Sequence, residues 1–152
     1  MRRPSEDLTD LGFRLLFSSI FVGLGGEHLF SDELISRLMP LWMPAPRMCS
    51  ILAGLVLTVG GVSLVVGYRV RQAAVLLGSF LVAVTVLVHA PALLGGSPPM
   101  PPGWDWMWVI LQRSNFVKNL CLLGVCLHLL HYQPMHWSLD GWFQRRRDQP
   151  KR

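Results

Sequence analysis

The sequence predicts an all-α integral membrane protein: a four-helix bundle with its N- and C-termini on the cytoplasmic side. Hydrophobic residues make up 51% of the 152-residue chain and charged residues only 15%, with a mean hydropathy of +0.40. A soluble domain carries about 25% charged residues. The apolar residues also gather into long stretches, at about residues 11–30, 48–67, 73–94 and 115–130. We therefore expect one transmembrane domain over residues 11–130.

The first stretch, LGFRLLFSSIFVGLGGEHLF, is long enough to cross a bilayer as a helix of about 30 Å. Residues 1–10 before it are polar and form a short N-terminal segment. Arg2 and Arg3 resemble the start of a signal peptide, but the apolar run exceeds the roughly 7–15 residues of a signal core and no clear cleavage site follows. The sequence favours an uncleaved first span, with cleavage after the glycine-rich part as the alternative.

The second and third stretches form a hairpin. Ser31 is expected to begin a short amphipathic helix in the connection before them, with Leu34, Ile35, Leu38 and Met39 on one face, which prolines 40, 44 and 46 end. The second stretch has no charge and contains Gly54, Gly60 and Gly61, small residues that allow close helix contact. The short basic turn at residues 68–72 makes the two spans antiparallel.

The fourth stretch, NFVKNLCLLGVCLHLL, follows a Pro- and Gly-rich connection and is short for a span. Residues 131–152 are aromatic and then strongly basic, so we expect a surface tail that ends in disorder. Three cysteines without a CxxC spacing give no metal or redox signature.

The distribution of cations gives the orientation. Nine lie on the side of the two termini and the 68–72 turn: Arg2, Arg3, Arg69, Arg71, Arg145, Arg146, Arg147, Lys151 and Arg152. Four lie on the other side: Arg37, Arg47, Arg113 and Lys118. The positive-inside rule then places both termini in the cytoplasm of a cell inner (plasma) membrane protein with several spans. The arginine-rich tail is expected to contact anionic lipid rather than nucleic acid.

This topology sorts the polar residues into two rims. Glu27, His28, His89, Asn115 and Lys118 fall at the outer rim, and the last two share a helix face. We expect mainly a structural network there, with Glu27 paired to Lys118. The functional alternative is a ligand site for a quinone headgroup, whose carbonyls need hydrogen bonds and whose reduction needs protons. Weaker alternatives are haem ligation by His28 and His89, and zinc or iron ligation by the same histidines with Glu27.

Arg14 and His128 fall at the inner rim, where a structural role is expected. Arg14 lies about one turn inside the membrane, where its side chain can snorkel to the headgroups. A pair with Asp10, four residues earlier, or a hydrogen bond to His128 would serve equally.

The order and spacing of these pieces resemble the DoxX-like family of small four-span membrane proteins. The matching segments are VGLGGEHLF, MPLWMPAP, LVVGYRVR, the third span ending near His89, and NFVKNLCLLG, over roughly residues 11–130. The resemblance implies a four-helix fold and an association with membrane redox metabolism, since some members are similar to a subunit of a thiosulfate:quinone oxidoreductase and others are associated with redox-stress complexes. Where many members have a lysine at the end of the first span, this chain has Glu27-His28, and its second span lacks their glutamate.

The sequence thus predicts an accessory or quinone-facing subunit of a membrane redox system, without independent catalytic activity. Its expected partners are the lipid bilayer and a membrane redox subunit. A structural partner of a larger membrane complex and a small-molecule transporter are the competing interpretations.

Overall fold

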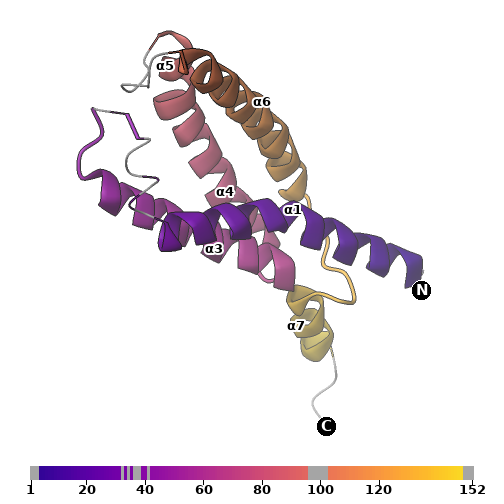
Figure 1. Ribbon diagram of the computed structural model, residues 1–152. Helices are drawn as coiled ribbons and strands as arrows, with labels where there is room; N and C mark the ends of the chain where they lie inside the picture. The colour runs from indigo at the N-terminus through magenta and orange to yellow at the C-terminus, as the bar shows by residue number, and fades with distance from the viewer. Residues whose placement is uncertain are drawn as a thin grey trace.

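The computed structural model describes residues 4–31, 33, 35, 39–40, 42–95 and 103–148, and this part of the chain is helical without a strand. Figure 1 shows the long helices α1, α3, α4 and α6 with the short α7 at the C-terminal end. The elements are, in order, α1 (Pro4–Phe30), α3 (Pro46–Val66), α4 (Val70–Val84), η1 (Thr85–His89), α5 (Ala90–Leu93), α6 (Asp105–Leu129) and α7 (Leu139–Asp148). The predicted all-α class is therefore confirmed.

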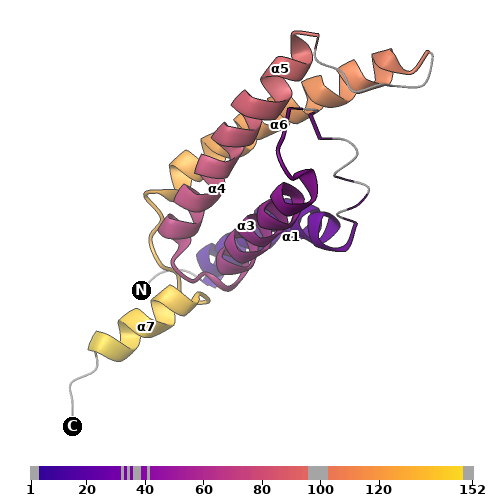
Figure 2. The same cartoon turned by 90° about the vertical axis from the view of Figure 1, so that its left-hand side faces the viewer.

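The long helices form two pairs, α1 with α3 and α4 with α6. The short α3–α4 turn joins the pairs at one end of the molecule, and from there they diverge, as Figures 1 and 2 both show. The core lies where they meet, around side chains such as Phe21, Leu64 and Leu77, which are at most 1% exposed.

Glycines of α3 let both neighbours approach it closely. A Cβ at Gly61 would lie 3.1 Å from the Cβ of Phe21 on α1, and a Cβ at Gly60 would lie 2.6 Å from Leu77 on α4. Contacts under 3.0 Å do not occur between real side chains without a shift of the neighbour. The expectation that small residues of the second span permit close helix packing is therefore confirmed.

The turn between α3 and α4 covers residues 67–69, which is shorter than the predicted 68–72. Gly67 ends α3 in the left-handed conformation (φ 66°), and its N–H and that of Tyr68 bond the carbonyls of Leu64 and Ser63. This is a Schellman-type end, which favours glycine because other residues are strained at positive φ.

Three helical stretches in the described part are long and apolar enough to cross a membrane: Pro4–Phe30, Pro46–Val66 and Val70–Leu93. α6 has 25 residues and starts at Asp105, ten residues before the stretch that was predicted as the fourth span. Polar residues in its middle, from Gln112 to Asn119, interrupt the apolar pattern by which the sequence would indicate a single long helix. The amphipathic helix expected after Ser31 lies mostly outside the described residues, which exclude Leu34 and Leu38.

Large apolar side chains cover the outside of these helices. Phe30 is 90% exposed, Leu16 79% and Leu87 52%. Water would not favour such a surface, whereas the hydrocarbon of a bilayer is as apolar as leucine. The outer surface therefore fits lipid as the solvent.

Candidate functional site

A cavity of about 380 Å³ lies between the two helix pairs, toward the C-terminal end of α1 and the N-terminal end of α3. Most of its lining is apolar. Its polar lining residues are His28, Cys49, His89, Asn115, Lys118 and Asn119. Four of the five residues predicted at the outer rim thus share one cavity, although they come from three different segments. Leu87 lines it while 52% exposed, so the cavity reaches the molecular surface.

His28 is held on α1 by its contact with α3. Its Nδ1 lies 3.0 Å from the Oγ of Ser50, which is fully buried and whose hydroxyl also lies 3.4 Å from the His28 carbonyl oxygen. Gly54 leaves room for this contact, because a Cβ there would meet the Cβ of His28 at 3.0 Å. The sequence analysis missed Ser50, since a serine in an apolar span is usually assigned to helix packing.

His89 ends a wider helical turn. Pro91 has no N–H and cannot bond the carbonyl of Leu87, four residues earlier, so one hydrogen bond of the regular helix is lost there. The chain instead forms the π-turn η1, in which the N–H of Ala90 bonds the carbonyl of Thr85. Such turns often occur at functional sites.

The π-turn presents two polar side chains to α6. His89 Nδ1 lies 2.6 Å from Oε1 of the buried Gln112, and Thr85 Oγ1 accepts a 3.1 Å hydrogen bond from Asn119 Nδ2. Gln112 was not predicted as a site residue. The spacing of residues 112, 115 and 119 could have indicated Gln112, because these three positions lie on one face of a helix.

Lys118 donates a 2.9 Å hydrogen bond to Asn115 Oδ1, one turn earlier on α6. Glu27 is exposed and does not line the cavity. The expected ion pair between Glu27 and Lys118 is not formed, although the two charges attract each other at longer range. Glu27 points away because it directly precedes His28, and neighbouring residues of an α-helix are turned by about 100° from each other.

Chemically, the cavity offers one ammonium donor, two imidazoles and two amides against apolar walls. No Asp or Glu belongs to its described lining. Within the described residues, no three His, Cys, Asp or Glu side chains lie close enough to hold a metal ion, so the alternative of zinc or iron on His28, His89 and Glu27 is not supported.

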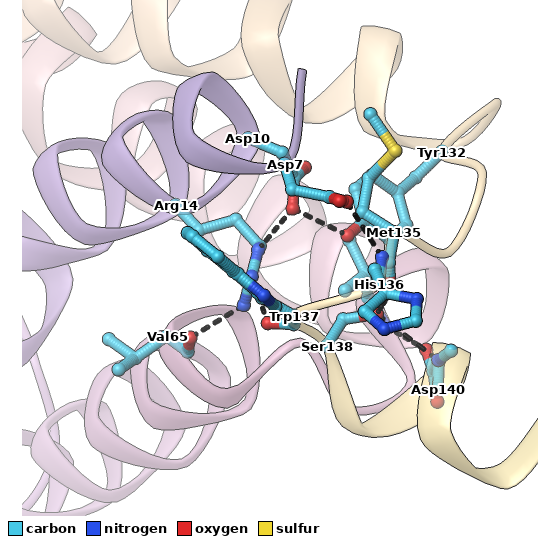
Figure 3. Close-up of polar contacts among 12 residues, drawn as sticks. Asp7, Asp10, Arg14, Val65, Tyr132, Met135, His136, Trp137, Ser138 and Asp140 are labelled. Carbon is cyan, nitrogen blue, oxygen red and sulfur yellow. Dashed lines mark hydrogen bonds and ion pairs between the residues drawn. The ribbon is translucent and has the colours of Figure 1, made fainter. Parts of the chain in front are cut away.

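A second polar cluster lies at the opposite end and centres on Arg14 of α1 (Figure 3). Its guanidinium is 1% exposed and makes a bond in each of three directions. Nε pairs with Asp10 Oδ2 at 2.8 Å, Nη1 donates to the Val65 carbonyl at 2.7 Å, and Nη2 donates to the Trp137 carbonyl at 2.6 Å. Pairing with Asp10 is thus confirmed, while snorkelling to the headgroups is wrong.

His128 is exposed and makes no hydrogen bond to Arg14, so that alternative is also wrong. It lines a separate groove between the start of α1 and the end of α6, together with Asp10 and Tyr132. Tyr132 donates to Asp10 Oδ2 at 3.1 Å. Burial, and then the Asp10 carboxylate, raise the pKa of the Tyr132 phenol.

The chain after α6 folds back onto this end, where a surface tail was expected. Asp7 Oδ1 accepts from the His136 N–H at 2.9 Å, which fixes the loop to the start of α1. Asp140 accepts from the N–H groups of Arg69 and Val70 at 2.9 and 3.3 Å, and so caps α4 from outside. The predicted disorder falls on residues 149–152, outside the described part.

Comparison with known proteins gives one result. A family model described as DoxX matches residues 9–90. No curated protein and no solved structure matches the chain.

Proposed function

The chain belongs to the DoxX family of membrane proteins, and we propose that it is an accessory subunit of membrane redox metabolism that binds a quinone-type headgroup between its two helix pairs. The cavity is the observation that carries this proposal. It combines an apolar wall with donors and imidazoles that can bond a carbonyl or hydroxyl on a ring.

The proposal includes a four-span topology in the cell inner membrane with both termini in the cytoplasm. With 25 residues, α6 is about 37 Å long and can cross the hydrocarbon core beside the three apolar stretches. An even number of spans leaves both termini on one side, which agrees with nine cations against four.

A quinone would lie with its ring among the apolar side chains and one oxygen toward α6. Lys118 can donate to one oxygen, because its ammonium has three N–H groups and the bond to Asn115 uses one. The exposed side chain of Leu87 marks the opening through which an apolar tail would pass to the lipid.

A transporter is less well supported. A transport path would have to continue from the cavity toward the inner end, where Leu57, Leu64 and Leu77 pack closely and are each at most 3% exposed. Beyond these residues, Arg14 binds the Trp137 carbonyl of the chain after α6. A purely structural partner is the other alternative, and it predicts that no ligand occupies the cavity.

The free thiol of Cys49 lines the cavity and provides a test. A variant with Cys121→Ser and Cys126→Ser keeps Cys49 as its single cysteine. In nanodiscs, decylubiquinone should slow maleimide labelling of Cys49 in a saturable way. A variant whose single cysteine is the exposed Cys121 controls for effects of the quinone on the bilayer.

Two further variants localise the binding. Lys118→Met should raise the half-protecting concentration roughly tenfold, because a hydrogen bond to a charged group is worth about 1.5–3 kcal/mol. Glu27→Gln should leave it unchanged, since Glu27 lies outside the cavity lining. Absence of saturable protection, or equal effects of the two variants, would contradict a quinone site here.

A further inference from the structure

We infer that the cavity selects the reduced, hydroxyl-bearing form of such a ring, a hydroquinone, over the oxidised quinone. This inference rests on the proposed function and concerns which atoms the two histidines present to the ligand. Each imidazole has one nitrogen engaged by a buried neighbour, and a neighbour that can only accept requires the proton on the nitrogen that it faces.

The partner of His89 is an acceptor. Gln112 Oε1 is a carbonyl oxygen and cannot donate, so at 2.6 Å the Nδ1 of His89 must carry the hydrogen. In the neutral ring, Nε2 then has a lone pair and no proton. Since Gln112 is 4% exposed, Nδ1 is turned into the protein and the opposite edge of the ring is left for the cavity.

His28 is oriented in the same way, with its Nδ1 3.0 Å from the Ser50 hydroxyl oxygen. That hydroxyl can donate to Nδ1 or accept from it, so His28 can adapt its tautomer to the ligand, whereas His89 cannot. Ser50 is fully buried, which leaves the Nε2 edge of the His28 ring as the one that lines the cavity.

The acceptor nitrogen of His89 discriminates between redox states. A hydroquinone O–H can donate to Nε2, and its oxygen can still accept from Lys118. A quinone oxygen has no proton, so it would place a lone pair against the lone pair of His89 Nε2. Selectivity arises from this unfavourable contact as well as from the hydrogen bond that the hydroquinone gains.

Labelling of Cys49 tests the inference with three related ligands. Decylubiquinol, decylubiquinone and the dimethyl ether of the quinol share ring and tail, and in the ether methyl groups replace the two donating hydrogens. Under anaerobic conditions we expect the quinol to protect at a concentration roughly tenfold below that of the quinone and the ether, as one to two hydrogen bonds would give.

Variants of His89 supply the matched comparison. His89→Phe should weaken protection by the quinol severalfold and strengthen protection by the quinone, because the opposing lone pair of Nε2 is removed. His89→Gln should restore part of the preference, because its amide oxygen can accept. If both variants fail to fold, ¹⁵N NMR of histidine-labelled parent protein can assign the tautomer of His89, and a proton on its Nε2 would overturn the inference.

The outcomes separate the two proposals. Equal protection by quinol, quinone and ether would overturn the selectivity and leave the quinone-type site standing. Protection by none of the three would overturn both.

Discussion

Replacing Arg14 by methionine should cost more stability than any other exchange of a single cation in the described chain. The guanidinium is buried and holds together α1, the end of α3 and the chain after α6. Methionine keeps much of the volume but leaves Asp10 without its counter-charge and the carbonyls of Val65 and Trp137 without their donor. Removing one partner of a buried ion pair costs about 3–5 kcal/mol.

Thermal unfolding in detergent, followed by tryptophan fluorescence, measures this cost. For a chain of this size, about 2–4 °C of Tm per kcal/mol predicts a fall of roughly 10 °C. Arg113→Met is the matched control, because Arg113 lies exposed on α6 and surface exchanges usually change stability by less than about 0.5 kcal/mol. Equal Tm values for the two variants would refute the conclusion that the hydrogen bonds of Arg14 hold α1, the end of α3 and the chain after α6 together.

Three other outcomes are expected. Gly67→Ala should lower Tm by several degrees, because the position has φ 66° and a Cβ there would lie 2.5 Å from the Cβ of Ser138; unchanged Tm would contradict this packing. The pKa of the Tyr132 phenol is higher in the folded protein than its ordinary value of about 10. The stability that this group contributes is complete below about pH 10 and is lost as the pH rises through the folded pKa. Tyr132→Phe should therefore make the fall of Tm above about pH 10 less steep. A phosphatase fused after Arg152 should be inactive in a bacterial host if the tail is cytoplasmic, and strong activity would reverse the proposed orientation.

The sequence predicted the helices well because each carries its own signal. Apolar stretches, the prolines before α3 and the glycine after it are local features, and their physical effects are local as well. α6 shows the limit of this reasoning. Its polar residues face η1 and the cavity, so hydropathy interrupts a helix that the backbone continues.

The candidate site could be predicted in part. The position of each residue along its predicted span placed His28, His89, Asn115 and Lys118 at a similar depth in the bilayer. That position does not show toward which side of the helix a side chain points. Glu27 was therefore placed in the site although it turns outward. The packing of the chain after α6 against α1 and α3 could not be predicted, for a different reason. Arg14 binds the backbone carbonyl groups of Val65 and Trp137, and every residue has such a group whatever its side chain.

The hydrogen bonds of the described residues are distributed unevenly between the two ends of the molecule. At the end that carries the C-terminal helix α7, Arg14 and Asp140 connect α1, the α3–α4 turn and the chain after α6. Around the cavity, His28 bonds only within the α1–α3 pair, and His89 only across to α6.

Separation of the two pairs at the cavity would consequently break apolar contacts but none of these hydrogen bonds. Apolar contacts exchanged for lipid or for an apolar ring cost little in a membrane. If the cavity binds a ring as proposed, the ligand would enter by widening the angle between the pairs, with the end around Arg14 as the hinge. The hydrogen bond between His89 and Gln112 lies inside one pair, so the tautomer of His89 would not change during this motion.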